Sequence, residues 1–199
     1  MNGLAGGYIS PQHGVDTEVN PASVPSGRNL IGIDAEKTPT LEAWDVGKQL
    51  VDQLIETKLA ETGEYPKKVA FSLWRSEFVR QEGITIAEIF YLLGVEPVRN
   101  RRGTVHDVRL IPAEELGRPR IDVVVQTSGQ FRDLGASRIY LINDAVALAA
   151  QAEGTDEFPN YVREGAIAAE TVMKENGASP AEAKELATIR VFGGLNGNY

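Results

Sequence analysis

The sequence predicts an α/β fold: a small, mostly parallel sheet of Rossmann-like or flavodoxin-like type with flanking helices, an extended N-terminal arm and a helical C-terminal part. Two short apolar runs, at residues 69–74 and 121–125, lie between turn-forming residues and are typical of buried strands. Between and beyond these runs, apolar residues recur at helical spacing. Strands that alternate with helices form parallel βαβ units, so the pattern favours this fold class.

Length and composition restrict the alternatives. We expect the 199 residues to form one structural domain, with an arm at 1–39, an α/β core at 40–135 and a helical part at 136–199 packed on that core. The net charge of −8 would repel phosphate backbones and anionic lipids, and no apolar run approaches the ~20 residues that span a bilayer. We therefore expect neither nucleic acid nor a membrane as a partner.

The chain has no cysteine, which excludes disulfides, thiolate metal sites and cysteine nucleophiles and fits a cytoplasmic location. The two histidines, His13 and His106, stand far apart in segments of different character, so we expect no metal site of conventional spacing.

The first ordered element follows the arm. Residues 1–39 are rich in Gly, Pro, Asn and Ser, and each proline pushes its predecessor toward extended geometry. Pro39 then stands where a helix tolerates its missing N–H. The apolar spacing predicts an amphipathic helix from residue 41 to about Thr62, ended by Gly63.

The strand at 69–74 comes next, and then a predicted helix. Thr85 and Glu88 match a capping box, Ile84 and Ile89 match a hydrophobic staple, and Gly94 ends the helix. Residues 95–98 and 104–111 are typical of a strand and its hairpin return. With the strand at 121–125, we predict a sheet of four or five strands.

The rest of the chain is predicted to be mostly helical, with apolar stripes over 139–149 and 162–173. Ser179 and Glu182 match a second capping box, which opens a final short helix. The tail at 192–198 is not a dinucleotide fingerprint, because no helix follows it, and we interpret it as a glycine loop near a ligand or as a frayed end.

Polar side chains follow both apolar strands, and we expect the two strand ends to open at one edge of the sheet. The chemistry offered there comprises carboxylates at Glu77 and Asp133, a guanidinium at Arg132, hydroxyls at Ser76 and Ser128, and aromatic walls at Trp74 and Phe131.

Simpler interpretations stay open at these positions. Ser76 and Asp133 are also good helix-capping residues, and the aromatics also suit a core. His13, in a Gly/Pro loop, is either a surface residue or a proton-transfer group. Six arginines form either a solvated hairpin face or an anion site; they are Arg99, Arg101, Arg102, Arg109, Arg118 and Arg120.

Several stretches resemble the motifs of one family, in the same order along the chain. They are Gly7-Tyr8-Ile9, Asn20-Pro21, Pro25 to Leu30 with Asp34 and Pro39-Thr40, LWRSE at 73–77, EGITIA at 82–87, GRPRIDV at 117–123 with SGQFRD at 128–133, DE at 156–157 with NYV at 160–162, and RVFG at 190–193 with GNY at 197–199. This series is similar to that of the CobN/magnesium chelatase large subunits, and the Gly27-Arg28-Asn29-Leu30 form leans toward the cobaltochelatase type.

The resemblance implies an internal domain fragment of a subunit that binds a tetrapyrrole and inserts Co²⁺, or Mg²⁺ in the related enzymes. It implies Glu77, Asp133 and His13 as bases or transient ligands, and Arg28 and Arg132 as holders of peripheral macrocycle groups. Trp74 and Phe131 would pack on the macrocycle face, with Ser76 and Ser128 also at the substrate.

The family implies ATP hydrolysis in a partner AAA+ ATPase subunit with an adaptor subunit, and the chain has no G-x-x-x-x-G-K-[ST] motif. We expect no cofactor in the fragment itself, while the whole complex uses ATP, Mg²⁺ and Co²⁺. A non-catalytic scaffold domain and a free-standing α/β binding protein stay as alternatives.

The sequence departs from the family pattern at three places. Arg75 stands where the family has Gly, Gln130 stands where it has an apolar residue, and Gly-Ala-Ser at 135–137 replaces Phe-Pro-Asn. These departures bear on which metal and which macrocycle are used.

Overall fold

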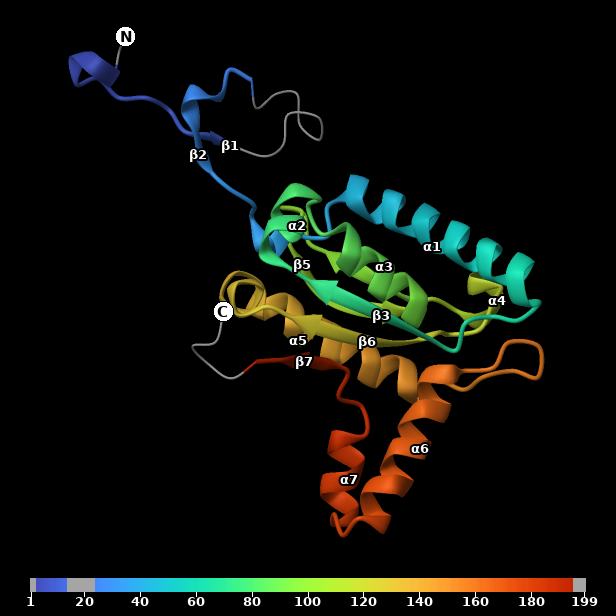
Figure 1. Cartoon of the computed structure of the whole chain (residues 1–199). Coiled ribbons are helices and arrows are strands. Elements are labelled where there is room, and N and C mark those ends of the chain that lie inside the picture. Colours follow the sequence, from blue (N-terminus) through green and yellow to red (C-terminus); the bar gives the residue numbers. More distant parts are fainter. Residues whose placement is uncertain (1–2, 14–23, 195–199) are drawn as a thin grey trace.

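The computed structural model describes residues 3–13 and 24–194 (Figure 1). The helices are α1 (Leu41–Thr62), α2 (Arg75–Arg80), α3 (Ile84–Leu93), α4 (Ala113–Leu116), α5 (Gly129–Gln151), α6 (Tyr161–Glu175) and α7 (Pro180–Leu186). The strands are β1 (Gln12–His13), β2 (Asn29–Ile31), β3 (Lys68–Leu73), β4 (Val95–Arg99), β5 (Val105–Leu110), β6 (Asp122–Thr127) and β7 (Val191–Gly193). Among the described residues, no helix is long and apolar enough to cross a bilayer.

Three parallel strands form the central sheet in the order β3-β6-β7. The β3–β6 register runs from Lys68↔Asp122 to Leu73↔Thr127, and Thr127 also pairs with Gly193 of β7. Helices flank this sheet, so the predicted α/β class with a mostly parallel sheet is confirmed. The helix over residues 41–62 is also confirmed, with Thr40 as its N-cap and Gly63 at its C-terminal end.

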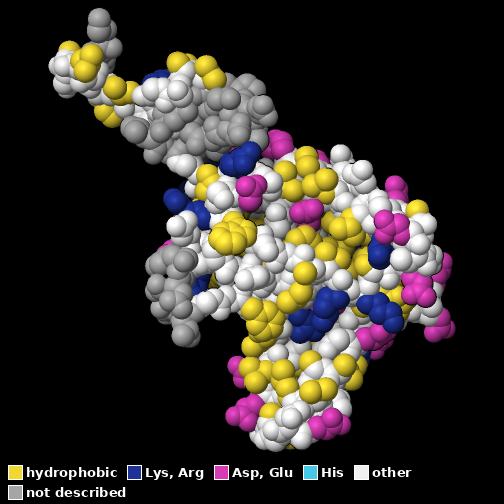
Figure 2. All heavy atoms as spheres, viewed as in Figure 1, with side chains coloured by type: hydrophobic (Ala, Val, Ile, Leu, Met, Phe, Trp, Pro, Cys, Tyr) yellow, Lys and Arg dark blue, Asp and Glu magenta, His cyan; other side chains and the backbone are white. Residues whose placement is uncertain are grey.

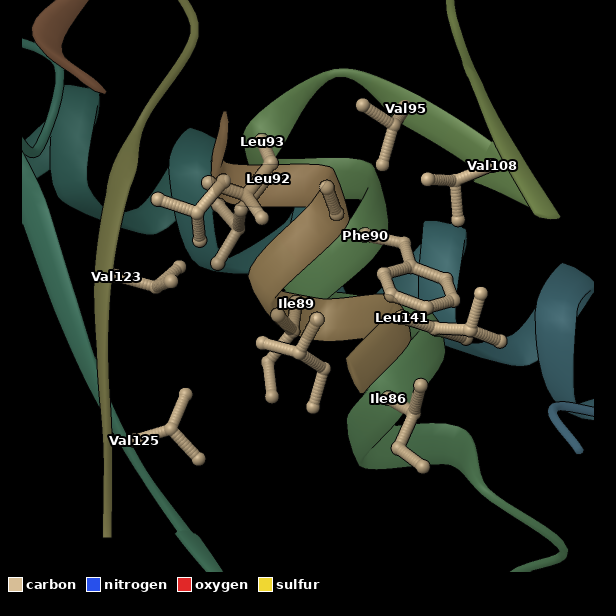
Figure 3. Close-up of a cluster of buried hydrophobic side chains, with 14 of the residues drawn as sticks. Ile86, Ile89, Phe90, Leu92, Leu93, Val95, Val108, Val123, Val125 and Leu141 are labelled. Carbon is tan, nitrogen blue, oxygen red and sulfur yellow. The ribbon is translucent and has the colours of Figure 1, made fainter. Parts of the chain in front are cut away.

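The hydrophobic core lies on one face of the sheet. Val123 and Val125 of β6 point toward Ile89 of α3 (Figure 3). Helix α5 packs against α3 on this side, and α1 packs against α3 in turn. Helices α6 and α7 pack on each other and extend away from the sheet as a helical hairpin (Figure 1).

The predicted sheet of four or five strands is wrong. Strands β4 and β5 form the expected hairpin, but among the described residues they pair antiparallel only with each other. Val95 and Val108 of this hairpin face the helices of the core (Figure 3), and β5 packs on α5. A helical layer therefore separates the hairpin from the sheet.

The third strand of the sheet, β7, lies where the sequence suggested only a glycine loop or a frayed end. Val191 pairs with Val125, and Phe192 pairs with Gln126. Residues 20–21 and 195–199, which carry two of the family-like motifs and most of the glycine-rich tail, lie outside the described residues.

One of the two predicted capping boxes is present. The Ser179 hydroxyl accepts a hydrogen bond from the Glu182 N–H at 3.3 Å, and the Glu182 carboxylate accepts one from the Ser179 N–H at 3.0 Å. The box at Thr85 is wrong, because α3 begins at Ile84 after Gly83, which has a positive φ of 89°. A Cβ at Gly83 would lie 2.9 Å from the Thr38 Cβ, so close packing against the start of α1 fixes this turn.

Two of the six arginines, for which a solvated face and an anion site were the alternatives, are buried instead. Arg120 donates to the carbonyls of Leu93 and Gly94, and its Nη2 donates to the Ile111 carbonyl at 2.6 Å. Arg118 donates to the Tyr91 carbonyl and lies over the Tyr91 ring, 4.5 Å from its centroid. Both guanidinium groups satisfy carbonyls at the C-terminal end of α3, where a positive charge is favourable.

Candidate functional site

The three parallel strands end at one edge of the sheet. Leu73, Thr127 and Gly193 are register partners, and the Ser128 N–H donates to the Leu73 carbonyl at 3.2 Å. The prediction that both polar strand ends open at the same edge is therefore confirmed. The edge carries the start of α2 from β3 and the start of α5 from β6.

The end of β3 presents an exposed aromatic side chain and a carboxylate. Trp74 is 58% exposed and precedes the first residue of α2, Arg75. Ser76 lies exposed in the first turn, and the structure gives α2 no side-chain cap, so the capping interpretation of Ser76 is wrong.

Glu77 lies one residue farther along α2. Its Oε2 accepts a hydrogen bond from Gln81 Nε2 at 3.1 Å, and its Oε1 lies 3.5 Å from Arg80 Nη1. The carboxylate thus interacts with side chains of its own helix and stays partly exposed.

The end of β6 is organised by Ser128, which caps α5. Its hydroxyl accepts a hydrogen bond from the Phe131 N–H at 3.2 Å. Asp133 lies within the helix with an exposed side chain, so the capping interpretation of Asp133 is also wrong. Arg132 Nη1 donates to the Gly194 carbonyl at 2.9 Å and links the start of α5 to the end of β7.

Phe131 is not a wall of the site. Its side chain is fully buried and packs edge to face on Phe78 of α2, with ring centroids 5.1 Å apart. Gly135 lies directly against the ring, because a Cβ at this position would be 2.9 Å from Phe131 Cζ. The expectation that Phe131 contacts a ligand is therefore wrong, and the ring instead joins α2 to α5 in the core.

A shallow polar pocket lies between α2 and α5. It has a volume of about 360 Å³ and is lined by Arg75, Gln130, Asp133 and Leu134. Sequence reasoning noted Arg75 and Gln130 without assigning them to the site. The signal that could have identified them is position, since the first turns of two helices that follow paired parallel strands are neighbours.

The described residues of the N-terminal arm, 3–13 and 24–39, do not line this pocket. His13 lies in β1, which pairs parallel with β2, and Arg28 Nη2 donates to Gln12 Oε1 at 2.7 Å within the same arm. Figure 1 shows β1 and β2 standing off from the central sheet. The structure thus brings Trp74, Ser76, Glu77, Ser128, Arg132 and Asp133 to one edge and leaves His13 and Arg28 apart from them.

No metal centre is evident in the described part of the chain, where no three His, Asp or Glu side chains come together as ligands. The sheet edge instead offers an exposed indole at Trp74, guanidinium groups at Arg75 and Arg132, and carboxylates at Glu77 and Asp133. Of these residues, Arg75 and Asp133 line the open pocket. Such a surface can hold a flat apolar molecule that has charged peripheral groups.

Comparison with known proteins decides the family. The family model described as CobN/Magnesium Chelatase matches residues 1–199.

The chain belongs to the CobN/magnesium chelatase family.

Members of this family and a solved structure resemble the chain along most of its length. It is 38% identical to the chloroplastic magnesium-chelatase subunit ChlH of Oryza sativa subsp. indica, over 98% of this chain and 14% of that protein. It is 32% identical to the aerobic cobaltochelatase subunit CobN of Sinorhizobium sp, over 100% of this chain and 16% of that protein. The structure of the catalytic subunit of cobaltochelatase from Mycobacterium tuberculosis superposes with a TM-score of 0.77 at 37% identity, covering 87% of this chain and 14% of that one. The chain therefore spans about a sixth of the length of these proteins.

Two of the three departures that the resemblance marks lie together. Arg75 and Gln130 both line the polar pocket. The third, the segment at 135–137, begins with Gly135 beneath the buried Phe131 ring and so lies in the core.

Proposed function

We propose that this chain is a domain of the large, tetrapyrrole-binding subunit of an ATP-dependent chelatase, whose substrates are Co²⁺ and a corrin-type macrocycle of cobalamin biosynthesis. A partner AAA+ ATPase subunit would hydrolyse ATP with Mg²⁺, an adaptor subunit would connect the two, and the complex would work in the cytoplasm. The observation that carries the proposal is an exposed Trp74, next in sequence to the pocket residue Arg75, at the carboxyl edge of a parallel sheet in a chain of this family.

The binding step uses the aromatic side chain and the guanidinium. Trp74 packs against the face of the macrocycle, because a flat conjugated ring gains contact area and favourable stacking on an indole. Arg75 holds a peripheral carboxylate or amide of the macrocycle. We assign this role to Arg75 and not to Arg28 or Arg132, because Arg28 lies in the arm and Arg132 already donates to the Gly194 carbonyl.

The insertion step needs a base. A divalent cation displaces the inner N–H protons of the macrocycle as the four nitrogens bind the metal. A corrin-type ring, whose bound form is a monoanion, releases one proton, and a porphyrin releases two. Asp133 lines the pocket, and Glu77 lies on the adjoining helix α2 with a half-exposed side chain. One of these carboxylates accepts the single proton of a corrin, and the two together accept both protons of a porphyrin, so either reaction balances.

A second candidate function is a scaffold or partner-docking domain without a role in catalysis. It is favoured by the local use of two site residues, since Ser128 caps α5 and Glu77 interacts with Gln81 and Arg80. A large subunit of a magnesium chelatase acting on a porphyrin is the alternative within the family, given the similarity to ChlH.

Titration of metal-free tetrapyrroles against the chain tests the binding step. The chain has two tryptophans, the buried Trp44 and the exposed Trp74, so quenching of their emission reports binding, and Trp44 still reports it in a Trp74 variant. We expect a corrin to quench the emission and Trp74→Ala to weaken its binding about tenfold. Tyr140→Ala is the matched control, because Tyr140 is an exposed aromatic of α5 that does not line the pocket.

The outcomes separate the candidates. Tighter binding of a porphyrin than of a corrin would favour the magnesium enzyme. Two results together would favour the scaffold. One is an absence of binding to either macrocycle. The other is an unchanged insertion rate when Glu77→Gln or Asp133→Asn is placed in a complete chelatase that carries this segment. Loss of insertion in both variants with unchanged macrocycle affinity would support their role as bases.

A further inference from the structure

Strand β3 has an open edge. The sheet order is β3-β6-β7, and in the described part of the chain no strand pairs with β3 on the side away from β6. The carbonyls of Lys67 and Leu73 accept hydrogen bonds from the Asp122 and Ser128 N–H groups, at 3.1 and 3.2 Å. Backbone direction alternates along a strand, so the backbone groups of the intervening residues Lys68, Ala70 and Ser72 point away from β6.

Helix α1 extends over this open edge. A groove of about 590 Å³ runs between α1 and β3, and its wall includes Leu50 and Leu54 of α1 together with Val69 and Ala70 of β3. Leu50 and Leu54 are 40% and 38% exposed, although the neighbouring Val51 is fully buried. Figure 2 shows hydrophobic side chains on this side of the molecule, over α1 and toward β3. The groove between α1 and β3 thus lies beside the edge at which a further strand of the sheet would pair.

The edge lacks the features that usually protect an edge strand. Proteins block such edges with proline, bulges or outward-pointing charges. The β3–β6 register is unbroken over six residue pairs, and β3 contains no proline. Its one charged residue, Lys68, is engaged across the sheet, since its Nζ lies 2.9 Å from Asp122 Oδ2.

We propose that the open edge of β3 and the adjoining face of α1 bind an extended β-strand from the remaining part of a chelatase large subunit. A row of backbone N–H and C=O groups is complementary to another strand. The chain matches 16% of the Sinorhizobium cobaltochelatase subunit, and most of that polypeptide lies outside the match. The bound strand spans about the six residues of β3 and presents apolar side chains to Leu50 and Leu54. This inference rests on the family and the edge geometry and does not require the proposed catalytic role.

Amide hydrogen exchange tests the proposal at single residues. Overlapping 15-residue synthetic peptides that cover the rest of the Sinorhizobium subunit are added to the chain, and exchange is followed by NMR. At least one peptide should slow exchange of the Ala70 and Ser72 amides by about tenfold or more. The Val69 and Phe71 amides, which face β6, are the internal control and should change less than about twofold.

Variants on the α1 side of the groove provide a second test. Leu54→Glu and Leu50→Glu should each weaken binding of that peptide by about tenfold or more, because a charge replaces a buried apolar contact. Ile167→Glu on α6 is the matched control, since Ile167 is 56% exposed and lies outside the groove, and it should leave the affinity unchanged.

Three results would overturn the proposal. The first is that no peptide protects Ala70 and Ser72. The second is a peptide that protects them equally in wild type and in both leucine variants. The third is protection that appears without peptide and rises with protein concentration alongside a dimer in sedimentation, which would make a second copy of the chain the occupant.

Discussion

Replacing Asp122 with Ala should lower the free energy of unfolding by about 3–5 kcal/mol, because it leaves a buried cation without its partner. The Asp122 side chain is 1% exposed, and its Oδ1 accepts a hydrogen bond from Arg190 Nε at 2.9 Å. Arg190 is itself 7% exposed, so water cannot replace the lost carboxylate. Lys68 also pairs with Asp122 but is half-exposed, and it adds no more than about 1 kcal/mol.

This ion pair holds the end of the chain to the sheet. Arg190 Nη1 also donates to the Ala187 carbonyl at 2.7 Å, and β7 begins at the next residue, Val191. Helix α6 comes so near that a Cβ on Gly165 would lie 2.7 Å from Asp122 Oδ2. Loss of the carboxylate should therefore loosen β7 and α6 together.

Urea unfolding followed by circular dichroism measures the loss of unfolding free energy. In thermal unfolding, the melting temperature should fall by roughly 6–20 °C. Asp45→Ala is the control, since Asp45 forms an exposed ion pair with Lys48 and should cost under about 1 kcal/mol. The double variant Asp122→Ala/Arg190→Met should recover most of the loss, because it removes both charges. A loss below about 1 kcal/mol for Asp122→Ala, or a double variant no more stable than the single one, would refute the reasoning.

Three further predictions follow from single contacts. Phe131→Ala should cost about 3–5 kcal/mol by opening a cavity against Phe78 while leaving tetrapyrrole affinity per folded molecule unchanged, and a specific loss of affinity in the folded variant would contradict its core role. Ser128→Ala should cost about 1 kcal/mol in urea unfolding through loss of the α5 cap, whereas an unchanged midpoint would argue against the cap. Burial raises the pKa of Glu88 above its ordinary value of 4.5. The folded state is therefore most stable, with respect to this group, below pH 4.5, and it loses that stability as the pH rises through the raised pKa. Glu88→Gln should therefore match wild type in the acid range and exceed it by less than about 1 kcal/mol at pH 7, and a constant difference across that range would disprove the assignment.

Local patterns predicted most of the elements. The helix over residues 41–62, the strands near 69–74 and 121–125, the hairpin and the final capping box were all predicted from spacing and turn chemistry, and each is confirmed. These features depend on neighbours within a few residues, so the sequence records them directly. The shared edge of the two strand ends followed as well, because parallel strands must end on the same side.

The capping interpretations of Ser76, Thr85 and Asp133 were local errors. The other errors involve partners that are distant in the sequence. From the sequence, Phe131 could be predicted equally well as a core residue or as a wall of the ligand site. The contact with Phe78 of α2, which places it in the core, is visible only in the structure. Arg118 and Arg120 belong to a charged cluster in the sequence, and only the approach of the end of α3 supplies carbonyls that allow their burial. The pocket residues Arg75 and Gln130 come from helices whose starting positions are set by strand pairing.

The sequence alone therefore determined the fold class, the order of elements and the family-like motifs, since periodicity and caps act over short distances. The tertiary structure alone decided that β4 and β5 leave the sheet and that Val191–Gly193 completes it. It also decided that His13 and Arg28 stay apart from the site and that β3 has an open edge. The physical reason is that backbone hydrogen bonds between distant strands, and the burial of charge against distant carbonyls, depend on three-dimensional packing that no local pattern encodes.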